Sequence, residues 1–188
     1  AASLFSDAMA EKAMELIGEN IRRFVANRTD VEAAEAMMVG SLFAGIAFSF
    51  ARLGNVHAMS HPVSAFFDVP HGVANAVLLP VVAEYNALAD HGRYYKIYNY
   101  ISEIPAYEDE FEPMMLVDAI RSLCKAIGIP ANLTEAINQA GKTGSISRET
   151  IEEKIEAMAA DAMKSGNIAV NPRSSRQCDI EMLYRKAL

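Results

Sequence analysis

The sequence predicts an all-α fold, a multi-helix domain of the bundle type with one buried central helix. Apolar residues recur at three- and four-residue steps along most of the chain, which is the period of an amphipathic helix. Serine, aspartate or asparagine often stands where such a run begins. No segment alternates apolar and polar residues with the turn signals typical of strands. With 188 residues, 52% of them hydrophobic, the chain is long enough for a single domain over residues 1–188.

The first two helices are expected over residues 3–25 and 31–53. The first has apolar residues on one face and acidic residues on the other, and Asp30 offers an N-cap for the second. The second is apolar nearly all round, which is typical of a helix in the centre of a domain. Gly40 and Gly45 weaken it by roughly 1 kcal/mol each relative to alanine. We interpret them as points where another helix approaches closely.

Seven further helical segments are expected after residue 53. They cover residues 56–67, 72–85, 94–100 and 113–127, a segment that begins at Asn132, and residues 147–163 and 176–186. Pro80 should kink or divide the second of these, because proline has no N–H and clashes with the preceding turn. Loops are expected over residues 141–145 and 166–175.

Composition and charge exclude several classes of function. The net charge is −7 and no basic block is present, so neither nucleic acid nor an anionic membrane is an expected partner. The longest apolar runs are broken well short of the about 20 residues that a membrane span needs. Cys124 and Cys178 match no metal-ligand spacing, and no secretory leader precedes them. We therefore expect a cytoplasmic protein with reduced thiols.

Three of the four histidines, His57, His61 and His71, lie within one 15-residue window. His57 and His61 are four residues apart and share a helix face, and a turn at Pro70 can bring His71 back toward them. Imidazole is the commonest metal ligand and titrates near physiological pH, so the cluster indicates a metal or catalytic site. Hydrogen-bonded core histidines are the alternative. Ala58 follows His57, so the His-Glu-x-x-His pattern is absent and a hydrolytic zinc site is disfavoured.

Three segments carry a specific pattern around these histidines. They are Ala44-Gly-Ile-Ala-Phe-Ser49, Leu53-Gly-Asn-Val-His-Ala-Met-Ser-His-Pro62 and Pro70-His-Gly-Val-Ala-Asn-Ala-Val-Leu-Leu-Pro80. Together with Asn171-Pro-Arg173 near the C-terminus, they resemble the iron-dependent alcohol dehydrogenase family. The resemblance covers essentially the whole chain, and it corresponds to the C-terminal, helical half of a usual family member.

The resemblance implies roles for five residues. His57 and His71, fourteen apart, match two of the family's four ligands to a divalent metal, which is iron most often and otherwise zinc. His61 matches a histidine beside the nicotinamide and the substrate, which implies cofactor binding and a catalytic proton relay. Phe48 matches a position that lines the substrate cavity. Asn167 falls where relatives often carry cysteine, and we assign it to the same cavity.

Two features of the family are absent from this sequence: the glycine-rich turn of the N-terminal nucleotide-binding domain and the Asp-x3-His pair that supplies the other two ligands. The resemblance therefore implies the metal-binding part of an NAD- or NADP-dependent dehydrogenase that interconverts small alcohols with aldehydes or ketones, and that is inactive as this chain alone. A stand-alone helical interaction domain with a relic site, and a metal-dependent hydrolase, are the alternatives. Uncovered apolar faces over residues 31–53 and 56–67 predict a homo-oligomer, most simply a two-fold dimer.

Overall fold

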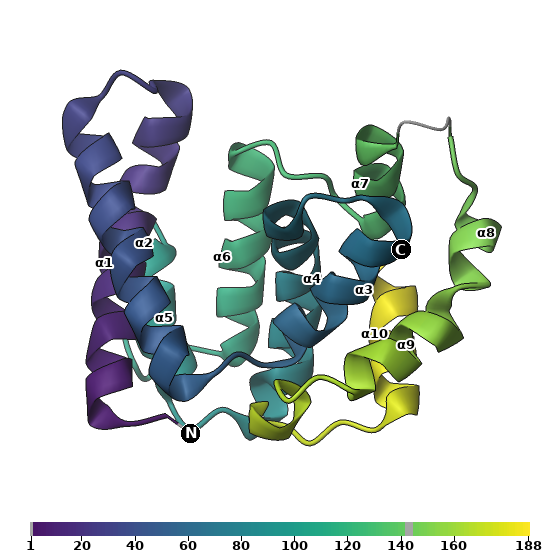
Figure 1. Ribbon diagram of the computed structural model, residues 1–188. Coiled ribbons are helices and arrows are strands. Elements are labelled where there is room, and N and C mark those ends of the chain that lie inside the picture. Colours follow the sequence, from purple (N-terminus) through teal and green to yellow (C-terminus); the bar gives the residue numbers. More distant parts are fainter. Residues whose placement is uncertain (1, 142–144) are drawn as a thin grey trace. The chain divides into compact units, whose positions relative to one another are not determined.

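The computed structural model describes residues 2–141 and 145–188, and all regular structure in these ranges is helical (Figure 1). The helices are α1 (Leu4–Ala26), α2 (Val31–Ala51), α3 (Asn55–Phe67), α4 (His71–Asn86), α5 (Arg93–Ile101), α6 (Pro113–Ala126), α7 (Leu133–Ala140), α8 (Arg148–Glu152), α9 (Ile155–Met163) and α10 (Gln177–Ala187), with short 3₁₀ turns η1 (Ala87–Ala89) and η2 (Ile168–Val170). The all-α prediction is confirmed. Most of the loop expected over residues 141–145 lies outside the described residues.

The chain forms two compact units, each made of two separate stretches. Unit 1 comprises Ala1–Arg52 and Asp90–Ile127, and unit 2 comprises Leu53–Ala89 and Gly128–Leu188. All three clustered histidines belong to unit 2, whereas Phe48 belongs to unit 1. The sequence predicted one domain for these same residues.

In unit 1, α1 and α2 form an antiparallel helical hairpin, and two glycines mark the tightest approaches. A Cβ atom added at Gly18 would lie 2.1 Å from the backbone oxygen of Tyr100 in α5. A Cβ at Gly40 would lie 2.7 Å from the Ile17 side chain, so the close approach expected at Gly40 is confirmed. Nothing lies within 4 Å of a Cβ at Gly45, and the same expectation is wrong there.

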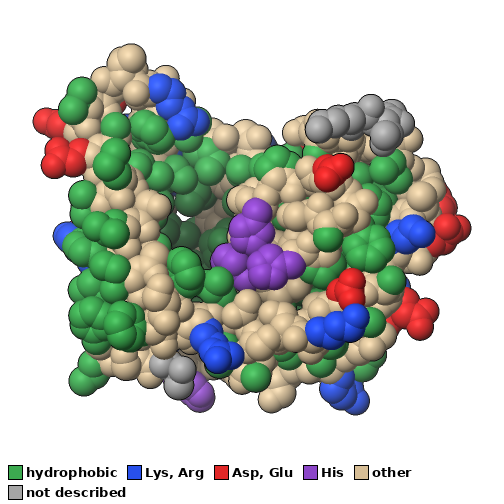
Figure 2. Space-filling model, viewed as in Figure 1, with side chains coloured by type: hydrophobic (Ala, Val, Ile, Leu, Met, Phe, Trp, Pro, Cys, Tyr) green, Lys and Arg blue, Asp and Glu red, His purple; other side chains and the backbone are tan. Residues whose placement is uncertain are grey.

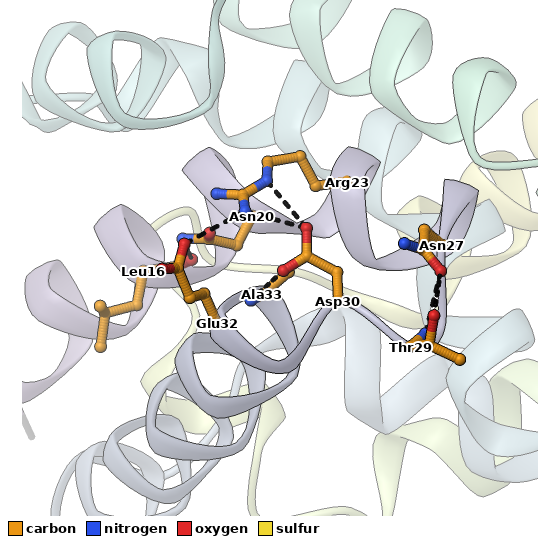
Figure 3. A network of polar contacts seen from close by, with 8 residues as sticks. All are labelled: Leu16, Asn20, Arg23, Asn27, Thr29, Asp30, Glu32 and Ala33. Carbon is orange, nitrogen blue, oxygen red and sulfur yellow. Dashed lines mark hydrogen bonds and ion pairs between the residues drawn. The ribbon is translucent and has the colours of Figure 1, made fainter.

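Polar contacts at the turn between α1 and α2 fix where the second helix begins (Figure 3). Asp30 is the N-cap of α2, as predicted, and its Oδ1 accepts a hydrogen bond of 3.0 Å from the Ala33 N–H. The Arg23 guanidinium donates to Asp30 Oδ2 at 2.9 Å. The Ala33 N–H, together with Arg23, lowers the pKa of the Asp30 carboxyl below its usual range. The ionised carboxylate therefore supports the start of the helix.

Helix α2 is largely exposed, which corrects the prediction of a buried central helix. Only Ala33, Gly40 and Ala47 are buried in it. Its large apolar side chains lie open, with Val31 77%, Met38 74%, Leu42 61%, Phe48 48% and Phe50 63% exposed. A sequence that is apolar on every side does not reveal which side is covered, and in unit 1 the covered side is the one that packs on α1.

The helix at the centre of a core is α4 in unit 2. Seven of its residues are buried. Six of these pack in one cluster with side chains from α3, α7, α9 and α10, and they are Ala74, Val77, Leu78, Val81, Val82 and Tyr85. The helix continues through Pro80, so the division expected there does not occur. The single helix predicted over residues 147–163 is instead two, α8 and α9.

Two segments, Val31–Ala51 and His71–Ala89, are long and apolar enough to cross a bilayer by length and composition alone. The sequence had predicted no such span. Core helices of soluble proteins have the same length and composition, so these two features alone do not indicate a span. The second segment contains α4, whose inner face is the core of unit 2.

Candidate metal and catalytic site

The three clustered histidines come together at the facing surfaces of α3 and α4. His57 and His61 lie one turn apart on α3, and His71 is the first residue of α4. The ring of His71 lies 5.2 Å from the ring of His57, edge to face, and 5.2 Å from the ring of His61, in a stack. Figure 2 shows a group of purple histidine side chains near the centre of the face drawn, with other purple atoms apart from it at the lower edge. The turn at Pro70 therefore does bring the third imidazole back to the first two.

Asn75 links the two histidines that match metal ligands. Its Nδ2 lies 3.2 Å from His57 Nε2 and 3.1 Å from His71 Nε2. Both imidazole nitrogens thus face one common point, although they come from different helices. The other end of the same amide, Asn75 Oδ1, is buried and has no hydrogen-bond partner.

Ser60 lies on the other side of the His71 ring. Its hydroxyl oxygen is 3.4 Å from His71 Nδ1, and the hydroxyl donates to the backbone oxygen of His57 at 3.2 Å. Ser60 is fully buried, whereas His71 is exposed. A polar group in this position connects the ring of His71 with the backbone of the helix that carries His57.

Asn171 ties the beginning of α3 to the end of α4. Its Oδ1 accepts from the Asn55 N–H at 3.1 Å and from Asn86 Nδ2 at 3.2 Å, and its own Nδ2 donates to Asn86 Oδ1 at 2.7 Å. A Cβ at Gly54 would lie 2.8 Å from Asn171 Oδ1, so glycine is needed for this approach. The distance between the two histidine-bearing helices is therefore set by a residue far along the chain.

The middle of α3 is anchored from α10. Pro62 has no N–H, so α3 lacks one internal hydrogen bond to the Ala58 carbonyl. The hydroxyl of the fully buried Tyr184 donates to the next carbonyl, that of Met59, at 2.7 Å. Burial raises the pKa of Tyr184 well above its ordinary value, so this hydroxyl stays protonated and remains a donor.

The donor set fits part of a metal site. Imidazole nitrogens suit iron and zinc, and the two Nε2 atoms that meet at Asn75 are placed to serve as two ligands. No group of three or more His, Cys, Asp or Glu in residues 2–141 and 145–188 is arranged to hold a metal ion. Burial, and secondly the neighbouring His71 and His61, lowers the pKa of His57, which favours the neutral form that binds metals.

The two residues expected in the substrate cavity, Asn167 and Phe48, belong to different units. Asn167 lies at the start of η2 and its Oδ1 accepts from the Leu53 N–H at 3.3 Å, just before α3. It supports the entry to the histidine-bearing helix. Phe48 is 48% exposed on α2 of unit 1.

Sequence reasoning missed Asn75, Ser60 and the connecting role of Asn171. Asn75 stands four residues after His71 and therefore on the same face of α4, a spacing that would have pointed to it. Ser60 and Asn171 have no such signal. Their contacts reach 11 to 116 residues along the chain, and only folding brings them together.

Comparisons with known proteins agree with the all-helical fold. The Fe-containing alcohol dehydrogenase family, C-terminal part, matches residues 1–188. The 1,3-propanediol dehydrogenase of Citrobacter freundii is 37% identical over 183 residues, which are 97% of this chain and 44% of that protein. The NAD-dependent methanol dehydrogenase of Bacillus methanolicus is 32% identical over 184 residues, 97% of this chain and 45% of that protein.

A crystal structure of a 1,3-propanediol oxidoreductase superposes with a TM-score of 0.86 at 36% identity, and covers 100% of this chain and 46% of that one. The fold is therefore that of a helical domain found in oxidoreductases of this kind. The chain belongs to the Fe-containing alcohol dehydrogenase family and corresponds to its C-terminal domain. It spans less than half the length of these relatives.

Proposed function

We propose that this chain is the metal-binding, catalytic part of an NAD- or NADP-dependent alcohol dehydrogenase that interconverts small alcohols with aldehydes or ketones. The observation that carries the proposal is the convergence of His57 Nε2 and His71 Nε2 on one point, in a member of this family. The names of the relatives support small alcohols as the substrate class, because one acts on 1,3-propanediol and another on methanol.

His57 and His71 would hold a divalent metal, iron first and zinc second, as two of its ligands. When bound, such a metal polarises the oxygen of an alcohol or carbonyl substrate. His61 would relay the substrate proton, because its imidazole is exposed and stacks on the ring of His71. The same ring would contact the nicotinamide. Phe48 and Asn167 are proposed to line the substrate cavity of the whole enzyme.

Hydride transfer requires a nicotinamide held against the substrate carbon. We propose that a nucleotide-binding α/β part, outside these 188 residues, holds the nicotinamide there. We also propose that the chain alone has no dehydrogenase activity. We propose a cytoplasmic location for such an enzyme, as expected from its two cysteines, which lie far apart in the sequence.

The first test assays the chain as it is. Purified protein receives methanol or 1,3-propanediol, NAD or NADP, and Fe²⁺ or Zn²⁺. We expect no turnover above that of a His61→Ala variant. After dialysis we expect well under one metal per chain, because two imidazoles leave at least two positions of a four-coordinate metal to water. Turnover above the control, or a tightly held stoichiometric metal, would contradict these expectations.

The second test supplies the proposed missing part. The α/β part of the Citrobacter freundii 1,3-propanediol dehydrogenase is fused ahead of this chain. We expect NAD-linked oxidation of 1,3-propanediol, lost on His57→Ala or His71→Ala. A folded, metal-loaded fusion without turnover would overturn the proposal. Hydrolysis of esters without any nicotinamide would favour a metal-dependent hydrolase instead.

A further inference from the structure

We infer that Ser60 is a positioning residue that fixes the tautomer of His71, so that Nδ1 carries the proton and Nε2 is left bare toward His57 and Asn75. The inference deepens the proposed function, on which it rests for the identity of the metal. The tautomer itself is a property of the chain without metal. It is therefore tested independently.

The first step concerns the single proton of the Ser60 hydroxyl. That proton is donated to the His57 carbonyl at 3.2 Å. The lone pairs of Ser60 Oγ then remain to face His71 Nδ1 at 3.4 Å. With its proton on that carbonyl, the Ser60 oxygen accepts from the ring, and we therefore infer that Nδ1 carries the hydrogen. Ser60 is fully buried, and water does not compete for this contact.

The second step comes from the opposite side of the ring. The Asn75 amide nitrogen carries two hydrogens, and it lies 3.1 Å from His71 Nε2 and 3.2 Å from His57 Nε2. Two N–H groups can be donated to two ring nitrogens only if both Nε2 atoms are bare acceptors. The contacts on the two sides of His71 thus favour the same tautomer, and the contact to Nδ1 comes from Ser60.

This tautomer is the one that a metal requires. A metal-binding imidazole presents one bare nitrogen and donates the N–H of the other to a neighbouring group, which also fixes the orientation of the ring. In this chain the neighbouring group is the hydroxyl of Ser60, which is held by the His57 carbonyl of its own helix, α3. The bare Nε2 is then set before any metal arrives, and loading needs no change of tautomer.

The experiment measures tautomers by ¹⁵N NMR of ¹⁵N-histidine-labelled, metal-free chain. It is carried out at about pH 8.5, where histidine rings are neutral. Signals are assigned with His57→Gln and His71→Gln. We expect His71 in the Nδ1–H form in the wild-type chain. In Ser60→Ala we expect His71 to shift toward the Nε2–H form, which is commoner for histidine in water, while His57 stays unchanged.

The matched control is Ser64→Ala. Ser64 lies one turn after Ser60 on α3, and its buried hydroxyl has no hydrogen-bond partner. The same substitution there should leave the tautomers of both rings as they are. A wild-type His71 protonated on Nε2, or an unchanged His71 in Ser60→Ala, would overturn the inference.

A second readout is Zn²⁺ affinity measured by competition with a chelator. We expect Ser60→Ala to bind Zn²⁺ about 10- to 100-fold more weakly than Ser64→Ala, which is the usual effect of losing the group that orients a histidine ligand. Equal affinities would contradict the inference. A wild-type chain with the expected tautomer but no Zn²⁺ binding would support the inference and contradict the proposed metal role.

Discussion

Asn75 places a hydrogen-bond donor at the point where two imidazoles meet, and leaves its own oxygen buried without a partner. An unsatisfied buried acceptor costs about 1–3 kcal/mol. Under the proposed function the amide nitrogen lies next to the place where a cation would bind, and it satisfies both rings while its own oxygen has no partner. Such an arrangement is typical of a site kept for a ligand rather than for stability.

Replacement of this amide by a carboxylate is expected to strengthen metal binding. Two donor atoms on one metal lie about 2.9–3.4 Å apart when each bond is about 2.0–2.1 Å, and the Asn75 nitrogen lies 3.2 and 3.1 Å from the two Nε2 atoms. Asn75→Asp thus adds an anionic ligand at a suitable place. We expect Zn²⁺ affinity to rise at least about tenfold, measured by calorimetry.

The control for this prediction is Asn75→Ala, which removes the amide and adds no ligand. If both variants bind Zn²⁺ with the same affinity, position 75 does not face the metal. If Asn75→Asp loses the affinity gain when His71→Gln is added, the carboxylate and His71 share one ion.

The sequence predicted the histidine pair but only half of the surroundings. A spacing of four on α3 and a proline before His71 were sufficient to expect the convergence of His57, His61 and His71. The supporting residues are serine and asparagine, which occur all along the chain. Their importance arises from partners that only folding brings close. Tyr184, which supports the Met59 carbonyl 125 residues away, is a further example of such a contact.

At the scale of the elements, alanine substitutions at two glycines of the helical hairpin are expected to change the free energy of unfolding in opposite directions. A Cβ at Gly18 meets the backbone of Tyr100 at 2.1 Å, and backbone cannot move aside cheaply. We expect Gly18→Ala to lower the free energy of unfolding by about 1–3 kcal/mol, as overpacking does. Gly45 faces open space in the middle of α2. Gly45→Ala should therefore raise the free energy of unfolding by about 1 kcal/mol.

Both glycine variants are measured by urea unfolding of the purified chain. The pair is internally controlled, because the substitution is the same and only the surroundings differ. Equal changes at the two positions would mean that α1 does not approach α5 as described. An effect at Gly45 in the destabilising direction would show that α2 has a cover at that point.

The cap at Asp30 predicts a pH dependence of stability. The pKa of its carboxyl is lowered in the folded chain, chiefly by the Ala33 N–H. The ionised group therefore contributes stability above its unfolded pKa of about 4, and loses it as the pH falls through the lower folded value. Asp30→Asn keeps a good N-cap but does not titrate.

We expect the wild-type chain to resist urea better than Asp30→Asn at neutral pH, since Asn cannot form the ion pair with Arg23. The difference should close below about pH 4. A difference that is constant from neutral pH to pH 3 would contradict a titrating role for Asp30.

Helix positions were predictable because the ends carry local signals, such as Ser3, Asp30, Asn132 and Ser147 at N-caps. The break between α8 and α9 carries none. Glu153 and Lys154 keep backbone angles near the helical region, and neither is glycine or proline. The prediction that α2 is buried was wrong for another reason. An amphipathic pattern shows which face of a helix is covered, but α2 is apolar on every face and therefore carries no such pattern.

At the scale of the whole molecule, the exposed apolar surface of α2 predicts self-association. Met38 is 74% and Leu42 61% exposed, and contiguous apolar surface of this kind is rare on monomers. We expect a homo-oligomer, most simply a dimer, by light scattering at micromolar concentration. Met38→Glu with Leu42→Glu should shift the chain toward the monomer.

Leu88→Glu is the control for association, because Leu88 is 82% exposed but lies outside α2. It should leave the oligomer intact. A wild-type chain that runs as a clean monomer of 20.5 kDa and binds no hydrophobic dye would reject the expectation.

Asn171 joins α3 to α4, and its late place in the sequence has a consequence for the order of events during synthesis. Asn171 follows its partner Asn86 by 85 residues, and a ribosome adds about 5–20 residues per second. The two histidine-bearing helices are thus made about 4 to 17 s before the residue that joins them. Nascent chain carries the imidazoles early but has no fixed distance between them. Under the proposed function, we therefore expect metal to bind at this site only after synthesis of the domain, when Asn171 has joined α3 and α4.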